Sequence, residues 1–221
     1  WDAEQFMEHI KFNKKLLSSY PERKSVIMSF TTHDEVSPIV LHGESFSDMI
    51  CWLEATLPFN PYSIDGFATG DDYIYPWANK KAEESQTDDD LYFVHRGKMD
   101  IFNLSRKPGG LNQYVKENFQ NAYKFRADKE DFIIKSDFVP IKTKDEKVFC
   151  YTRNLGNTSL IVLGNLDFKS CKSKISLKIP GVKKKSYVNI IKGDKVKFSG
   201  KVMNTDLEAG EIKVIEVQKE G

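Results

Sequence analysis

A mostly apolar run near the start of this chain ends abruptly on three ionisable side chains. The run covers residues 25–31, and Thr32, His33, Asp34 and Glu35 follow it. Such a run is typical of a strand in a parallel sheet that is buried on both faces. In α/β barrels the active site lies at the carboxyl ends of the strands, so ionisable residues in this position are candidates for chemistry. The same residues also suit an ordinary polar turn, because many strands end in acidic turns.

Helical and strand patterns alternate over the first 66 residues. Apolar residues recur at helical spacing from residue 3 to residue 17, which predicts a helix before the first strand. A capping-box pattern at Ser45 and Asp48 predicts the start of a second helix, which Pro58 ends. A second strand is expected over residues 62–64. Helix, strand, helix, strand is the repeating unit of a parallel α/β fold.

The loop after the second predicted strand is unusually long, from Phe67 to about Gly110. Loops longer than about 15 residues are usually functional or disordered, and the many aromatic residues in this one disfavour disorder. We therefore expect an ordered excursion with short secondary structure of its own, near residues 91–94. A third amphipathic helix is predicted over residues 111–123.

From about residue 137 the pattern changes to short strands separated by turn signals at intervals of roughly ten residues. Six or seven such strands suggest a small antiparallel β-sandwich. We therefore expect two domains, residues 1–137 and residues 138–221. The predicted strands are residues 148–152, 159–163, 175–179, 187–191, 196–202 and 212–217.

Basic and acidic residues nearly cancel, with 33 Lys and Arg against 32 Asp and Glu and a formal net charge of +1. This balance argues against a general nucleic-acid or membrane-surface binder, and no apolar run approaches the ~20 residues that span a bilayer. The charge is uneven, because residues 71–90 are acidic and residues 169–201 are basic. We expect both segments to be solvated surface.

The three cysteines, Cys51, Cys150 and Cys171, are too few for a disulfide framework. Cys150 and Cys171 could pair if their strands are neighbours, but we expect free thiols. The histidines show no ligand spacing, so no metal and no cofactor are predicted. The chain begins on Trp1 and enters a helical pattern at once, so we expect it to be a piece of a longer protein.

Two segments of the amino-terminal half carry a specific family resemblance. Residues 30–34, Phe-Thr-Thr-His-Asp, resemble the Phe-x-Asn-His-Asp segment that ends the seventh barrel strand of α-amylase family glycoside hydrolases, with Thr32 in place of Asn. Residues 55–66 are similar to the Leu-Pro-Gly-x-Pro-x-Ile-x-x-Gly segment that leads into the eighth strand. Residues 148–153 and 160–165 resemble the opening strands of the family's carboxyl-terminal sandwich.

The resemblance covers nearly the whole chain and implies a fold of α/β plus all-β type. The chain would form the last two βα units of a (β/α)8 barrel, followed by an antiparallel β-sandwich. The implied activity is cleavage of α-glucosidic bonds in starch-like or malto-oligosaccharide substrates. The resemblance makes Asp34 the catalytic residue that stabilises the transition state, and His33 a donor to a sugar hydroxyl.

Three further residues are expected at the same pocket. Asp65 directly follows the second predicted strand, and Tyr73 and Trp77 lie on the long loop after it. The two aromatic rings could stack on a sugar ring at the mouth of the pocket. They also suit packing of the loop against the barrel.

Retaining hydrolysis needs a nucleophilic carboxylate and a general acid about 5 Å apart. In the family these groups come from the fourth and fifth strands, and nothing here resembles the Gly-x-Arg-x-Asp segment of the nucleophile. We therefore predict that the chain alone is inactive and that its partners are the missing amino-terminal part of the barrel and an α-glucan or oligosaccharide substrate, without nucleic acid or membrane. The alternative is a non-catalytic carbohydrate-binding or interaction module in which the sandwich is the working part.

Two parallel strands cannot close their own edges or bury both of their faces. Either the remainder of the barrel lies outside this chain, or the amino-terminal half packs on its own sandwich. We favour the first possibility.

Overall fold

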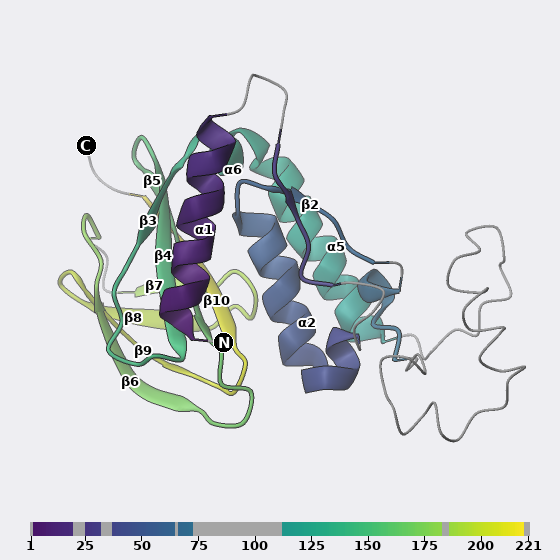
Figure 1. Ribbon diagram of the computed structural model, residues 1–221. Helices are drawn as coiled ribbons and strands as arrows, with labels where there is room; N and C mark the ends of the chain where they lie inside the picture. Colours follow the sequence, from purple (N-terminus) through teal and green to yellow (C-terminus); the bar gives the residue numbers. More distant parts are fainter. Residues whose placement is uncertain are drawn as a thin grey trace, which may run out of the picture.

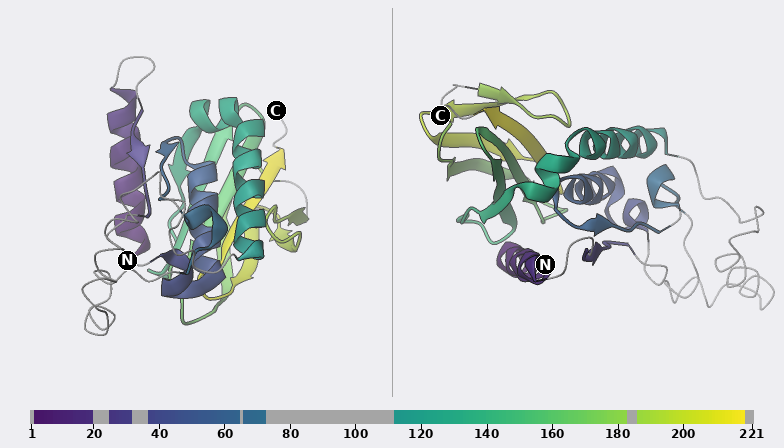
Figure 2. Two further views of the ribbon diagram at one scale, coloured as in Figure 1. Left: turned by 90° about the vertical axis from the view of Figure 1, so that its right-hand side faces the viewer. Right: turned by 90° about the horizontal axis from the view of Figure 1, so that it is seen from above.

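The computed structural model describes residues 2–19, 25–31, 37–64, 66–72, 112–182 and 186–218. In these ranges a layer of helices packs beside a two-sheet β-sandwich (Figure 1). The two long helices α2 and α5 lie side by side, and α1 lies apart from them against the sandwich (Figure 2). The amino-terminal elements are α1 (Ala3–Ser18), β1 (Ile27–Met28), α2 (Pro38–Thr56), β2 (Asn60–Pro61), the 3-10 turn η1 (Phe67–Thr69), α5 (Gln113–Asp128) and α6 (Glu130–Lys135).

β1 and β2 pair in parallel, with Ile27 opposite Asn60, which confirms the predicted direction of the first two strands. The predicted burial on both faces is wrong. Met28 faces the core, whereas Ile27 is 67% exposed, because the described part of the chain covers only one face of this sheet. The predicted position of the second strand is also wrong, because β2 covers Asn60–Pro61 and ends before residues 62–64. These are the only parallel strands in the described residues, so a partial barrel is not confirmed.

The second helix begins earlier than predicted. α2 starts at Pro38, which occupies the first turn behind the N-cap Ser37. His42 and Gly43 then break the helical backbone, and Gly43 takes φ 70° and ψ −158°, a conformation open to glycine alone. Ser45 does not form the predicted capping box with residue 48, because its hydroxyl donates to the His42 carbonyl.

The third helix is confirmed as α5, and α6 was not predicted. The structure predicted near residues 91–94 lies outside the described residues.

The carboxyl-terminal half is an antiparallel sandwich, as expected. Its two four-stranded sheets have the orders β10-β5-β4-β3 and β6-β9-β8-β7. The stretch predicted as one strand over residues 196–202 is two strands, because the chain turns at Gly200 with φ 61°. The strands are β3 (Asp137–Pro140), β4 (Val148–Leu155), β5 (Thr158–Asn165), β6 (Lys172–Lys178), β7 (Ser186–Val188), β8 (Lys195–Ser199), β9 (Val202–Leu207) and β10 (Ile212–Gln218).

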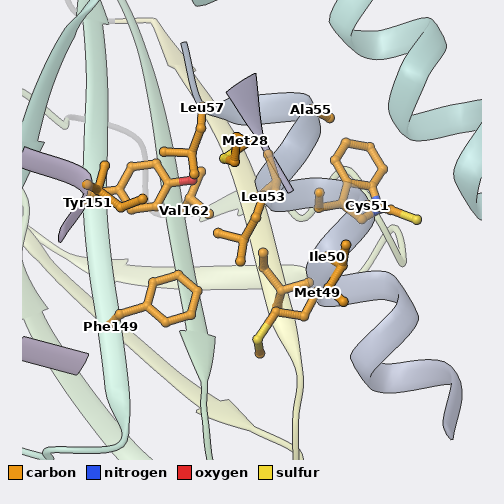
Figure 3. Close-up of a cluster of buried hydrophobic side chains, with 14 of the residues drawn as sticks. Met28, Met49, Ile50, Cys51, Leu53, Ala55, Leu57, Phe149, Tyr151 and Val162 are labelled. Carbon is orange, nitrogen blue, oxygen red and sulfur yellow. The ribbon is translucent and has the colours of Figure 1, made fainter. Parts of the chain in front are cut away.

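Two hydrophobic clusters hold the layers together. One joins the helices to the face of β4, β5 and β10 that points away from the second sheet, and Figure 3 shows Met49 and Leu53 of α2 facing Phe149 and Val162 across this interface. The other fills the space between the two sheets. The amino-terminal half therefore packs on the sandwich. The favoured possibility, that the remainder of the barrel lies outside this chain, stays a prediction. Because one cluster spans residue 137, the division into domains 1–137 and 138–221 stays a prediction.

Arg153 of β4 connects the two halves. Its side chain is fully buried, and its guanidinium donates to the main-chain carbonyl of Thr56 at 2.6 Å and to those of Ile133 and Ser136. Burial lowers the pKa of Arg153 to about 10, so the group remains charged at neutral pH. One cation thus ties a strand of the sandwich to the ends of α2 and α6.

All three cysteines are free thiols, as expected, and Cys51 and Cys150 are buried. Trp52 also lies in the core, at 2% exposure.

Candidate functional site

The carboxyl ends of β1 and β2 are joined by a side chain. Thr31 is 4% exposed, and its Oγ1 accepts a hydrogen bond from the backbone N–H of Ile64 at 3.0 Å. Ser29 fixes this end of the chain further, because its hydroxyl donates to the Thr31 carbonyl at 2.5 Å. The predicted site segments follow directly from these two joined positions, residues 32–36 after Thr31 and Asp65 after Ile64.

A short loop, residues 66–72, lies at the same end of the sheet. Its backbone closes on itself through a bond from the Asp71 N–H to the Gly66 carbonyl at 3.0 Å. Ser37, at the start of α2, donates its hydroxyl to the Asp71 carbonyl at 2.9 Å, and the Asn112 N–H donates to the Thr69 carbonyl at 3.0 Å. The chain segments that enter and leave the predicted site are therefore bonded to one another.

We expect Gly70→Ala to loosen this loop. Gly70 has φ 63°, and a Cβ there would lie 2.7 Å from the Cβ of Asn112 and 3.0 Å from that of Val115. The left-handed backbone costs an alanine about 1–2 kcal/mol, and the clash with α5 adds to this. Gly156→Ala is the control, because Gly156 has φ 54° with open space around it. Thermal unfolding should show the larger loss for Gly70→Ala, and equal losses would contradict the close approach.

The five residues predicted to form the site lie outside the described residues. These are the catalytic candidate Asp34 and the substrate-binding candidates His33, Asp65, Tyr73 and Trp77. Their roles remain predictions. The structure joins Thr31, which precedes the segment of His33 and Asp34, to Ile64, which precedes Asp65.

Sequence reasoning missed a buried polar cluster between α2 and α5. Asp48 is 6% exposed and accepts hydrogen bonds from Tyr114 and Asn118, both at 2.6 Å, while Trp52 donates to Asn118 at 3.0 Å. Burial raises the pKa of Asp48 to about 6. The spacing of four between Asp48 and Trp52 places both side chains on one face of a predicted helix, which was the one signal in the sequence. Their partners could not be predicted, because they lie on α5, more than 60 residues along the chain.

A second buried carboxylate lies on the same interface. Glu54 is fully buried, and its Oε2 accepts hydrogen bonds from Ser63 at 2.9 Å and Tyr123 at 2.8 Å. Burial raises its pKa. Arg126 beside it donates to three backbone carbonyls where α2 leads into β2, those of Glu54, Leu57 and Phe59. These partners all belong to the packed elements themselves, so we interpret both carboxylates as structural.

We expect Asp48→Asn to remove a pH dependence of stability. The folded-state pKa of about 6 exceeds the ordinary 3.8, so the folded protein binds the proton more tightly. Stability from this group is therefore greatest below pH 4 and is lost as the pH rises to about 6. At pH 8 the asparagine variant should be more stable by about 1–3 kcal/mol.

Denaturant unfolding between pH 4 and 8 measures this difference, with Asp131→Asn at an 85% exposed position as the control. Parallel pH profiles for Asp48→Asn and the unchanged protein would contradict the assignment.

Within the described residues there is no group of three or more His, Cys, Asp or Glu side chains that could hold a metal ion. In those same ranges, no helix has the length and apolar character to cross a membrane.

No family model and no curated protein matches this sequence. Solved structures do match its fold. An Anoxybacillus α-amylase superposes with a TM-score of 0.67 at 12% identity, covering 100% of this chain and 43% of that one. The α-amylase of Geobacillus thermoleovorans, solved with acarbose, gives 0.65 at 12% identity over 100% of this chain and 44% of that one. A debranching enzyme of Nostoc punctiforme gives 0.64 at 14% identity over 97% and 40%.

The chain thus spans less than half the length of the structures that it matches. At 12–14% identity the comparison establishes the fold. It agrees with the resemblance found in the sequence motifs. This chain therefore has the fold of the carboxyl-terminal portion of α-amylase family glycoside hydrolases.

Proposed function

We propose that this chain is the carboxyl-terminal part of a glycoside hydrolase that acts on α-glucosidic bonds of starch-like or malto-oligosaccharide substrates. The observation that supports it most is the bond between Thr31 and Ile64, which joins the carboxyl ends of two parallel strands. Catalytic groups of parallel α/β folds lie at this end of the sheet. The three enzymes compared above share the fold over the full length of this chain or nearly so.

Asp34 would act on the charge that develops in the reaction. Cleavage of a glycosidic bond passes through an oxocarbenium-like transition state. A fixed carboxylate near the anomeric carbon stabilises that state more than it stabilises the bound substrate. His33 can donate a hydrogen bond to a sugar hydroxyl while neutral, and Asp65, Tyr73 and Trp77 would complete the substrate contacts.

The nucleophile and the general acid would come from the part of the barrel that precedes this chain. The exposed face of the β1–β2 sheet supports this arrangement. Ile27 is 67% exposed and Tyr62 is 59% exposed, on strands whose other face packs against the core. Further strands and the side chains of a barrel interior would bury such a face.

A direct test compares this chain with the proposed longer protein, in which the remaining barrel strands precede it. We expect the longer protein to release reducing sugar from malto-oligosaccharides and this chain alone to release none. Turnover by the chain alone would contradict the proposed division of catalytic groups. A longer protein that binds malto-oligosaccharides and cleaves none would favour the non-catalytic alternative.

The sandwich itself offers little for carbohydrate binding through aromatic stacking. Four of its aromatic side chains, Phe149, Tyr151, Tyr187 and Phe198, are buried at 9% exposure or less, and Phe138 and Phe168 are partly buried against the core. In the described strands of the sandwich the rings therefore serve the core. This observation disfavours binding of neutral sugars to the sandwich by stacking on aromatic rings.

A further inference from the structure

Positive charge is concentrated in one segment of the sandwich. Residues 168–201 hold eleven lysines and a single acidic residue, Asp194, although the whole chain carries a formal net charge of only +1. The remainder of the chain is therefore acidic. Such asymmetry in a chain of balanced composition is a feature of surfaces that meet a charged partner.

The folded chain places several of these lysines on one face. Burial alternates strictly along β8, where Val196 and Phe198 face the core while Lys195 and Lys197 are exposed. Lys178 of β6 is exposed in the same way, and Leu177 beside it is buried. The exposed residues form the outer face of the sheet β6-β9-β8-β7, which lies on the side of the sandwich away from the helices (Figure 2).

The lysines on this outer face lack the ion pairs that neutralise lysines at its rim. Lys172 contacts Asp145 and Asp167, Lys192 contacts Glu211, and Lys213 contacts Asp194. In the described residues no carboxylate lies within 4 Å of the ammonium groups of Lys174, Lys178, Lys195, Lys197 and Lys201. The acidic residue on the strands of this face is Asp206 of β9, which accepts a bond from the Lys174 backbone N–H at 2.7 Å. The five ammonium groups therefore have no carboxylate partner in the part of the chain that the structure describes.

Uncharged hydrogen-bonding groups lie between these lysines. The register places Lys197 opposite Asn204 and Ser186, and Asn204 opposite Ser176, so one row across the sheet contains three hydroxyl or amide side chains. Two lysines on alternate positions of β8 are about 7 Å apart along the strand. The face thus offers point charges interspersed with hydrogen-bond donors and acceptors.

We propose that this outer face binds an anionic polysaccharide, a polymer that carries hydroxyls together with sulfate, phosphate or carboxylate groups. Lysines supply point charges for the anions, and Ser176, Ser186 and Asn204 can bond the hydroxyls. The described residues of the face include no arginine and no exposed aromatic ring, the groups that stack on nucleic-acid bases. Val188 of β7 is apolar and 52% exposed on this face, but one such side chain without an exposed aromatic ring provides little area for entry into a bilayer interface. The inference does not depend on the proposed catalytic function.

Dextran sulfate and neutral dextran test this proposal, because the two probes share a backbone and differ in charge. We expect the protein to bind dextran sulfate, with an affinity that falls as salt rises, and to bind dextran far more weakly. The triple variant Lys178→Gln, Lys195→Gln, Lys197→Gln should lose at least tenfold in affinity. The control variant Lys15→Gln, Lys124→Gln, Lys135→Gln removes the same charge from exposed helix positions and should lose less than threefold.

Equal losses in the two triple variants would overturn the proposal, as would an absence of binding to dextran sulfate. Binding of duplex DNA or of phosphatidylserine vesicles as tightly as dextran sulfate, with the same loss in the first variant, would also overturn it, because the face would then recognise negative charge alone. Thermal unfolding of both variants verifies that they are folded.

Discussion

Asp34→Asn in the longer protein is expected to lower kcat/KM for malto-oligosaccharides by on the order of 10³-fold or more. The amide preserves the size of the side chain and removes the negative charge. If Asp34 stabilises the oxocarbenium-like transition state, the loss corresponds to about 4 kcal/mol of activation free energy. It should appear mainly in kcat, because the interaction strengthens as positive charge develops on the sugar.

The neighbouring acid provides a matched control. Glu35→Gln removes the same charge one residue further along the chain, and we assign Glu35 no role. Its kcat/KM should stay within a few-fold of the unchanged protein. Normal turnover by Asp34→Asn, or equal losses in the two variants, would refute the assignment of Asp34.

Arg153→Met is expected to lower the free energy of unfolding by about 3–5 kcal/mol, because buried carbonyls lose a charged hydrogen-bond donor. Methionine fills much of the same space but leaves the carbonyls of Thr56, Ile133 and Ser136 without this donor. Hydrogen bonds to a charged group contribute about 1.5–3 kcal/mol each, and unsatisfied buried carbonyls add a penalty. Arg153→Lys should lose most of the same stability, because an ammonium cannot reproduce the planar fork.

Lys14→Met is the comparison for this prediction. Lys14 donates to the same Ser136 carbonyl at 3.0 Å, but through one bond from a half-buried side chain. Its loss should be about 1 kcal/mol or less. Denaturant unfolding measures the three variants. An Arg153→Met variant as stable as Lys14→Met would show that the guanidinium does not hold the two halves together.

Local periodicity was sufficient for much of the fold. The helix over Ala3–Ser18 and the alternating strands of the sandwich each bury one face, so their patterns are visible in short windows. The parallel direction of β1 and β2 also followed from the order of helices and strands. The turn at Gly200 was missed because apolar residues continue on both sides of it.

Features set by tertiary contacts could not be predicted. The run at residues 25–31 suggested burial on both faces, but what covers a strand is decided elsewhere, and Ile27 is exposed. Ser45 and Asp48 fit a capping box, yet Asp48 bonds to side chains of α5. In the sequence Arg153 resembles an ordinary strand residue, and only the folded chain places the ends of α2 and α6 around it.

The candidate site came from a family motif together with the position of charged residues after a strand. Composition and spacing alone left an ordinary polar turn open at His33 and Asp34. The structure adds the bond between Thr31 and Ile64 at the base of these segments.

The most direct measurement is a crystal structure of the longer protein with bound acarbose, the ligand present in the α-amylase structure from Geobacillus thermoleovorans. We expect the inhibitor in a pocket at the carboxyl ends of β1 and β2, with the Asp34 carboxylate and the His33 ring within hydrogen-bonding distance of its sugar rings. An inhibitor bound elsewhere, or an Asp34 side chain directed away from the occupied pocket, would contradict the account.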